Sequence, residues 1–190
     1  MMQDCPGPSL TLQLPSLALE EDFYRMVREY RKAGESYDTL LEPLLDHLPT
    51  YLRRVDQIAR GISLPVGIVQ QTLFWLVRDD KSIVAMGRLR HYLTPALEKE
   101  GGHIGYTVRP SERRKGYGTL LCALLIQEAR NRLGLSRVLI TCDSDNIGSA
   151  RIIQKNGGCF ENEVISDWSG KPVSRFWVST TPTPSTIYRL

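Results

Sequence analysis

The spacing of hydrophobic side chains changes along the first sixty residues. Leu10, Leu12 and Leu14 alternate with polar residues, which predicts a half-buried strand. From Leu19 to Lys32 apolar residues recur every three or four positions, so this segment is predicted to form an amphipathic helix. A second, less regular helical stretch runs from about Thr39 to Arg60 and is interrupted by two prolines. The first third of the chain is therefore predicted to contain one strand followed by helices.

Strand patterns dominate from residue 72 onward. Two apolar runs, Thr72–Val77 and Ser82–Met86, flank a polar turn and predict an antiparallel hairpin. Further strands are predicted at His103–Val108 and Arg175–Val178. Arg137–Cys142 is almost continuously apolar, a composition typical of a strand at the centre of a sheet.

Two more helices are predicted between these strands. Gly116–Leu133 has the clearest helical pattern, and Ile147–Asn156 forms a short helix that ends at two glycines. Pro95–Gly102 is predicted to be a loop with at most one helical turn. With no internal repeat and no long linker, residues 1–190 are expected to form one α+β (mixed α/β) domain. The predicted buried side of the longer helix consists of Leu120, Leu121, Leu124, Leu125, Ala129 and Leu133.

The composition is that of an ordinary globular domain. Of the 190 residues, 42% are hydrophobic and 24% are charged, which suffices for one core and argues against disorder. The longest apolar run, Leu120–Ile126, is far below the roughly 18 residues of a membrane span. The N-terminus also lacks the apolar segment of a secretory signal. Cys5, Cys122, Cys142 and Cys159 form no CxxC pair, so we expect free thiols in a cytoplasmic protein and no metal.

The net charge of +3 is too small to indicate a nucleic-acid partner, but the position of the charge is informative. Four cations fall within the seven residues Arg109–Lys115, and Gly116 and Gly118 follow at a predicted helix start. A helix N-terminus has unpaired N–H groups and a positive dipole end, and glycine lets a phosphate approach the backbone. The segment therefore predicts an anion-binding loop, although it matches neither the Walker A pattern nor GxGxxG. The alternative is a solvated basic turn.

The same segment resembles a known motif. Arg113-x-x-Gly116-x-Gly118 looks like the [Q/R]xxGx[G/A] pyrophosphate loop of the GNAT superfamily of N-acetyltransferases. The resemblance covers roughly Thr72–Val178, and the first seventy residues are compatible with it. Stretches in the same order that resemble a bacterial-type subgroup are Phe74-Trp75-Leu76, Arg90-His91, Gly101–Tyr106, Val108-x-Pro110, Arg109–Arg113, Cys142-Asp-x-Asp-Asn146 and Lys155–Gly158.

This resemblance implies a GNAT fold, in which a mixed, mostly antiparallel sheet has helices on both faces. Acetyl-coenzyme A would bind in the opening between two splayed parallel strands, here His103–Val108 and Arg137–Cys142. Residues 72–178 would form the acetyl-coenzyme A core, and residues 1–70 would form the acceptor side.

The resemblance also implies which residues touch this cosubstrate. The backbone of Thr107 and Val108 would pair with the pantetheine arm, and Asn146 would contact its end. The N–H groups of the glycine loop would hold the pyrophosphate. The full set implied for binding is Thr107, Val108, Arg113, Arg114, Lys115, Gly116, Tyr117, Gly118, Thr119, Asn146 and Ser149.

The resemblance leaves the acid and the base of the reaction open. In many family members the acid that protonates the leaving thiolate is a tyrosine seven residues after the asparagine that corresponds to Asn146. Ile153 stands there, so water, another tyrosine or unassisted departure are the alternatives. His103, His91 and Asp143 are the candidate bases, because the histidines have a suitable pKa range and the aspartate ends a strand. Each histidine could instead have a packing or supporting role.

The sequence is therefore interpreted as an acetyl-coenzyme A-dependent N-acetyltransferase. It would transfer the acetyl group to an amine of a small molecule or peptide by direct attack in a ternary complex, without a metal. One alternative is a non-catalytic acyl-coenzyme A sensor, which Ile153 favours; another is a nucleic-acid-binding module that uses the cations of the loop. We expect neither nucleic acid nor membrane as a partner, and a homodimer stays open.

Overall fold

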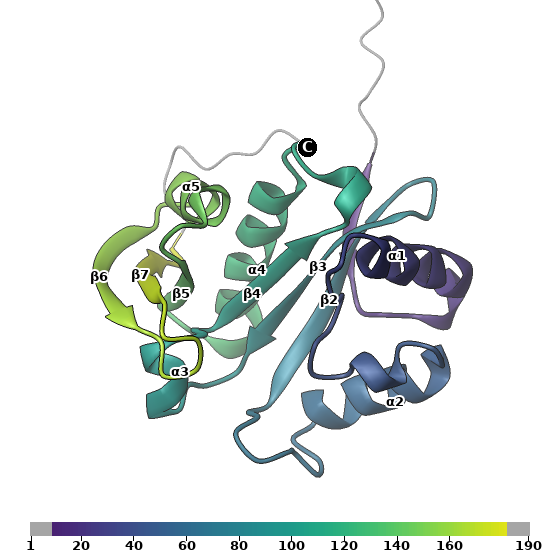
Figure 1. Ribbon diagram of the computed structural model, residues 1–190, viewed down its shortest axis with the longest axis horizontal. Helices are drawn as coiled ribbons and strands as arrows, with labels where there is room; N and C mark the ends of the chain where they lie inside the picture. Colours follow the sequence, from purple (N-terminus) through teal and green to yellow (C-terminus); the bar gives the residue numbers. More distant parts are fainter. Residues whose placement is uncertain (1–8, 182–190) are drawn as a thin grey trace, which may run out of the picture.

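Figure 1 shows the computed structural model of the chain, which describes residues 9–181. The predictions for Cys5 and for the two ends, residues 1–8 and 182–190, lie outside the described residues. The strands are β1 (Leu10–Gln13), β2 (Gln71–Arg78), β3 (Ile83–Arg90), β4 (Ile104–Val108), β5 (Arg137–Asp143), β6 (Cys159–Ile165) and β7 (Pro172–Ser179). The α-helices are α1 (Glu20–Lys32), α2 (Leu48–Ala59), α3 (Pro95–Lys99), α4 (Tyr117–Leu133) and α5 (Ile147–Lys155), and single 3-10 turns lie at Leu17–Leu19, Glu42–Leu44 and Pro110–Glu112.

Two antiparallel sheets meet at β4 and β5. Four strands pair in the order β1-β2-β3-β4, and three pair in the order β5-β7-β6. Helix α4 leaves the end of β4 and returns to the start of β5, so these two strands run in the same direction. They touch near their starts, where the His103 N–H donates to the Leu139 carbonyl at 2.7 Å. No ladder joins β4 and β5 in residues 9–181, so they splay toward Val108 and Asp143 as predicted.

Helices cover both faces of the four-stranded sheet, which confirms the predicted architecture. Helices α1 and α2 lie on one face and α4 lies on the other (Figure 1). Successive residues of β2 point to opposite faces, so Trp75 packs in the core under α1 and α2, while Phe74 packs in the core under α4. The chain thus forms one mixed α/β domain around a central sheet layer.

The structure corrects three details of the sequence prediction. Strand β6 was not expected: it is a sheet edge with almost every side chain exposed, so it has no hydrophobic pattern. Strand β5 is apolar because its faces are packed, yet it has a ladder partner on one side only. On α4, which packs against both β4 and α5, Cys122 and Ile126 are buried. The predicted core positions Leu120, Leu124 and Leu133 are only partly buried.

Candidate functional site

The segment between β4 and α4 presents a row of unpaired backbone N–H groups. The N–H groups of residues 114–118 donate to no atom in the described part of the chain. The N–H groups of Thr119 and Leu120, in contrast, already donate to the Gly116 carbonyl at 3.0 and 3.2 Å. Arg114 and Gly116 are left-handed, with φ of 66° and 88°, and such residues turn successive N–H groups into a concave anion site. With the positive end of the α4 dipole behind them, these five amides suit a phosphate.

The two glycines of this loop have different roles. Gly116 has a positive φ, and a Cβ atom there would meet nothing within 4 Å, so its conformation is what requires glycine. Gly118 has an ordinary backbone, but a Cβ atom there would lie 2.8 Å from Cδ1 of Ile152 and 3.4 Å from Cγ2 of Val108. Gly118 therefore makes room for the packing of α5 on α4, while its N–H group is one of the five unpaired amides.

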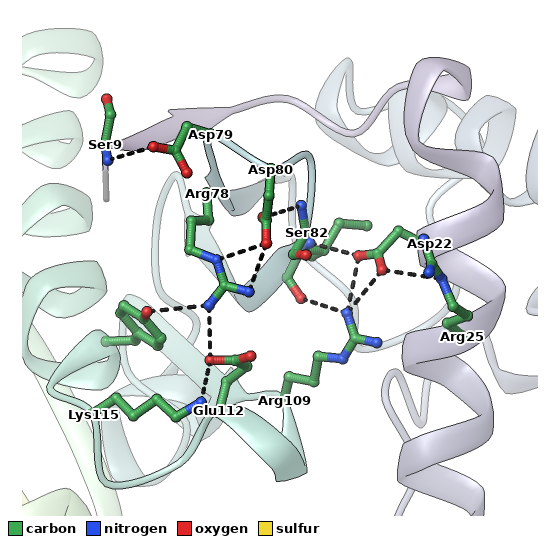
Figure 2. A network of polar contacts seen from close by, with 12 residues as sticks. Ser9, Asp22, Arg25, Arg78, Asp79, Asp80, Ser82, Arg109, Glu112 and Lys115 are labelled. Atoms are coloured by element: carbon green, nitrogen blue, oxygen red, sulfur yellow. Dashed lines mark hydrogen bonds and ion pairs between the residues drawn. The ribbon is translucent and has the colours of Figure 1, made fainter. Parts of the chain in front are cut away.

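Two cationic side chains of the segment, Arg109 and Lys115, contact carboxylates of the protein itself (Figure 2). Arg109 is buried, and its guanidinium lies 2.9 Å from Asp22 and 2.7 Å from Glu29, both on α1. Lys115 donates to Glu112 at 2.9 Å. These charges stabilise the protein's own carboxylates, and the N–H group of Lys115 stays unpaired within the described chain.

The remaining two cations differ from each other. The Arg113 guanidinium donates to both carboxylate oxygens of Glu35, at 2.9 and 2.6 Å, and its Nε donates to the Val108 carbonyl at 3.2 Å. The hydrogen bond from Arg113 lowers the pKa of Glu35 below its usual value, although partial burial opposes this. Arg114 forms no ion pair with any residue from 9 to 181. The cation that remains for an anion at the amides is therefore Arg114.

A further ionic contact fixes the loop from the side of β2. Nη1 of Arg78 donates to Glu112 at 3.2 Å and to the Tyr117 hydroxyl at 3.4 Å (Figure 2). The side chain of Tyr117 is buried, so it anchors the first turn of α4, while its N–H belongs to the row of amides. The predicted contribution of Tyr117 is thus a backbone group.

The edge of β4 that faces β5 provides a second set of unpaired backbone groups. The Arg109 N–H donates to the Val84 carbonyl at 3.0 Å, and the Arg90 N–H donates to the His103 carbonyl at 2.8 Å. Because backbone direction alternates along a strand, residues 105 and 107 bond to β3, while residues 104, 106 and 108 point toward the opening. The backbone groups of Val108 and Tyr106 therefore face the opening, and those of Thr107 face β3.

A pair of hydroxyl groups spans the opening. The Tyr106 hydroxyl lies 3.0 Å from Oγ of Ser149, near the start of α5. Asn146 caps α5, because its Oδ1 accepts the Ser149 N–H at 3.0 Å. Burial raises the pKa of Tyr106 above its usual value, and the contact with Ser149 opposes this only in part, so Tyr106 is protonated at neutral pH. Ile153 is fully buried in the core under α5, and the hydroxyl pair supplies proton donors that this residue lacks.

The three predicted bases are not brought together. Nδ1 of the buried His103 accepts the Leu139 N–H at 2.9 Å, and burial lowers the pKa of this histidine despite that bond. Nε2 of His91 lies 2.8 Å from the Thr72 hydroxyl, and burial lowers the pKa of His91. Both histidines lie at the starting end of β4, about 20 Å along the strand from the loop. Asp143 is exposed where β5 splays from β4.

One polar cluster was missed by sequence reasoning. Arg88 of β3 lies 3.0 Å from the buried Asp38, which also accepts the Tyr51 hydroxyl at 3.1 Å. These residues come from three distant segments without a shared motif. The available signal in the sequence was a charged residue, Arg88, within an otherwise apolar strand. Within residues 9–181 no group of three or more metal-ligating side chains occurs, and no helix there has the length and apolar character to cross a membrane.

Comparison with known proteins agrees with this geometry. Residues 21–158 match the family model described as the acetyltransferase (GNAT) domain. Over 54 residues the chain is 39% identical to the N-acetyltransferase YjdG of Bacillus subtilis, and this match covers 28% of the chain and 32% of YjdG. The chain therefore matches about a third of the length of this curated relative.

Solved structures share the fold at low sequence identity. RimJ of Mycobacterium smegmatis, in complex with a coenzyme A disulfide, has a TM-score of 0.68 and 15% identity, with 91% of this chain and 86% of RimJ covered. RimL, a ribosomal L7/L12 alpha-N-protein acetyltransferase in complex with coenzyme A, has a TM-score of 0.66 and 14% identity, with 90% and 94% covered. A mutant of the spermidine N-acetyltransferase SpeG of Vibrio cholerae has a TM-score of 0.61 and 11% identity, with 90% and 94% covered.

Proposed function

The chain belongs to the GNAT acetyltransferase family, and from this premise we propose that it transfers an acetyl group from acetyl-coenzyme A to an amine. The observation that carries the proposal is the row of five unpaired N–H groups at residues 114–118. Five aligned amides at a helix N-terminus fit a diphosphate, and no contact inside the described chain accounts for them. Residues 72–178 would form the acetyl-coenzyme A core, and the preceding segment would form the acceptor side.

The chain's own groups fit the two chemical halves of this cosubstrate. The amides and Arg114 hold the anionic half. Tyr106 and Val108 offer backbone groups to the peptide-like arm, which pairs as an added strand along β4. Asn146 caps α5 and thereby places Ser149 beside the opening. Gly116, Gly118 and Thr119 contact the cosubstrate in this proposal because they lie in the loop and in the first turn of α4.

The reaction asks the protein for alignment and proton transfer. The amine nitrogen attacks the thioester carbonyl carbon, the carbon–sulfur bond breaks, and the amine loses one proton while the thiolate gains one. We assign the proton donor to the Tyr106–Ser149 pair, because both hydroxyls lie at the opening and Tyr106 stays protonated. Asp143 stays the candidate base, whereas His103 and His91 support the sheet through their bonds to Leu139 and Thr72.

The acceptor class follows from the family at a coarse level. By their names, the similar proteins acetylate spermidine or the N-terminus of a ribosomal protein, so amine acceptors of small-molecule or peptide type are proposed here. Cys122, Cys142 and Cys159 are free thiols, which accords with our proposal of a reducing compartment such as the cytoplasm.

The two alternatives lose the observations that favoured them. Ile153 favoured a non-catalytic sensor, but the Tyr106–Ser149 pair offers another acid. The nucleic-acid alternative rested on four loop cations, of which Arg109, Arg113 and Lys115 are paired with carboxylates.

Binding and turnover test the proposal together. Acetyl-coenzyme A is expected to raise the melting temperature of the protein, and an amine panel should release coenzyme A thiol with at least one member. Ser149→Ala should slow the single-turnover rate without weakening binding of acetyl-coenzyme A, since a positioned acid contributes about 10²–10⁴-fold. Binding of acetyl-coenzyme A without thiol release would instead support the sensor. Failure to bind acetyl-coenzyme A would overturn both the transferase and the sensor.

A further inference from the structure

Two arginines of β3 lie on the acceptor side of the central sheet. Arg88 and Arg90 are two positions apart, so their side chains leave the same face of the strand. Arg88 is opposite Gly105 of β4, where a Cβ atom would lie 3.5 Å from Cγ of Arg88. The aliphatic stem of Arg88 therefore lies over Gly105.

The charges of this face do not balance. Arg88 is neutralised by Asp38 at 3.0 Å. Arg90 has no carboxylate partner among residues 9–181: its Nη1 donates to the carbonyl oxygens of Gly101 and Gly102 at 2.8 and 2.9 Å. Burial, together with the charge of Arg88, lowers the pKa of Arg90 to about 10. One desolvated cation is therefore left without an anion, and the rest of its guanidinium has no described partner.

The unbalanced charge lies where an acceptor would approach. Gly101 and Gly102 directly precede His103, at the point where β4 and β5 begin to splay. A small hollow of about 20 Å³, room for one water molecule, lies on the same side of the sheet, with Arg88 but not Arg90 in its wall. Its other walls come from the α1–α2 connection, α2 and β2, namely Asp38, Leu40, Leu41, Val55, Ile58, Gln71 and Leu73. The row of amides at residues 114–118 lies at the other end of β4.

We infer that the acceptor is an amine that carries a carboxylate, and that Arg90, backed by Arg88, binds this carboxylate. The inference rests on the proposed acetyl transfer and specifies its substrate class. A guanidinium fork binds a carboxylate with two parallel hydrogen bonds, and it repels a cationic polyamine. The carboxylate can belong to a free amino acid or to an acidic residue near a peptide N-terminus, and the two sources share this chemistry.

Wild-type protein tests the substrate class without any variant. Thiol release from acetyl-coenzyme A is measured with glutamate, its diamide, spermidine, and two peptides that differ only in Asp or Lys at the second position. The proposal expects kcat/KM at least tenfold higher for a carboxylate acceptor than for its neutral or cationic counterpart. Comparing kcat/KM for glutamate with kcat/KM for the Asp peptide distinguishes a free amino acid from a peptide as the source of the carboxylate. Equal rates, or preference for spermidine or the Lys peptide, would overturn the inference while leaving the proposed transfer intact. Failure of every acceptor would overturn both.

A variant series assigns the effect to Arg90. Arg90→Gln should raise the KM for the preferred carboxylate acceptor at least tenfold. The KM for the neutral counterpart of that acceptor and the affinity for acetyl-coenzyme A should not change. Arg90→Lys should recover part of the loss, because it keeps the charge without the fork. Arg60→Gln on α2 is the matched control, since this exposed arginine is paired with Asp56 within its own helix. An equal change of KM for charged and neutral acceptors would contradict a carboxylate subsite. If Arg90→Gln does not fold, the acceptor panel with the wild-type protein tests the inference instead.

Discussion

The loop at residues 109–118 and the face formed by α1, α2 and β3 handle charge in opposite ways. In the loop, three of the four cations are paired with carboxylates, and the groups left for a ligand are backbone amides. On the helical face, Arg88 is paired with a carboxylate while the partly buried Arg90 is not. In our proposals, one region binds its ligand through the backbone and the other binds its ligand through a side chain. A backbone site depends on local sequence, whereas a side-chain site is assembled from distant segments.

The largest expected effect comes from the residue that joins the two regions. Arg109 is the first residue of the loop, and its side chain pairs with Asp22 and Glu29 of α1. Arg109→Met should lower the free energy of unfolding by about 3 kcal/mol, because the buried Asp22 keeps only the exposed Arg25, 3.4 Å away, and Glu29 loses its cation. Urea denaturation measures this, with Arg114→Met as the exposed control from the same loop. A loss below about 1 kcal/mol would mean that Arg109 belongs with the ligand-binding cations.

A double-mutant cycle sharpens the account of the loop glycines. Gly118→Ala should cost roughly 1–3 kcal/mol of stability through overpacking against Cδ1 of Ile152, although alanine is the better helix former. Ile152→Val removes that carbon atom, so the double variant should be more stable than the sum of the single effects implies. Thermal or urea unfolding of the four proteins gives the coupling energy. Strict additivity would show that Gly118 is not required for packing on α5.

The free energy of unfolding should depend on pH through His103, which lies at the junction of β4 and β5. The folded state lowers the pKa of His103, so below about pH 6.5 the unfolded state binds more protons and the folded state loses stability. The slope that His103 contributes is at most about 1.4 kcal/mol per pH unit. His103→Asn keeps an acceptor for the Leu139 N–H, so its unfolding free energy should fall less between pH 7.5 and pH 5.5. Identical slopes for both proteins would contradict a buried, neutral His103.

The smallest effect is expected for the unpaired cation of the loop. Arg114→Ala should weaken binding of coenzyme A by about fivefold at most, since an exposed ionic contact contributes roughly 0.2–1 kcal/mol. The difference from wild type should shrink at high salt, and the melting temperature should not change. Calorimetric titration at two salt concentrations checks this. A loss far above fivefold would mean that side-chain charge, and not the amides, dominates the site.

The sequence predicts the loop better than the helical face, because the loop is formed by contiguous residues and the helical face by distant segments. The strand, the glycine loop and α4 are contiguous, so their pattern predicted these elements and indicated an anion-binding loop. The sequence showed that Arg109 is charged but not that α1 supplies its partners, because Asp22 lies 87 positions away. Asp38 and Arg88 likewise meet only in the folded chain. Strand β6 escaped prediction because an exposed edge strand needs no apolar alternation.

Amide hydrogen exchange with and without coenzyme A tests the central claim most directly. The account predicts that the N–H groups of residues 114–118 exchange fast in the protein alone and become protected when coenzyme A is added. The N–H groups of Tyr106 and Val108, on the open edge of β4, should gain protection as well. Adenosine 3′,5′-bisphosphate, which lacks the pantetheine arm, should leave Tyr106 and Val108 unprotected. Binding of coenzyme A that leaves residues 114–118 exchanging at their original rate would contradict the account.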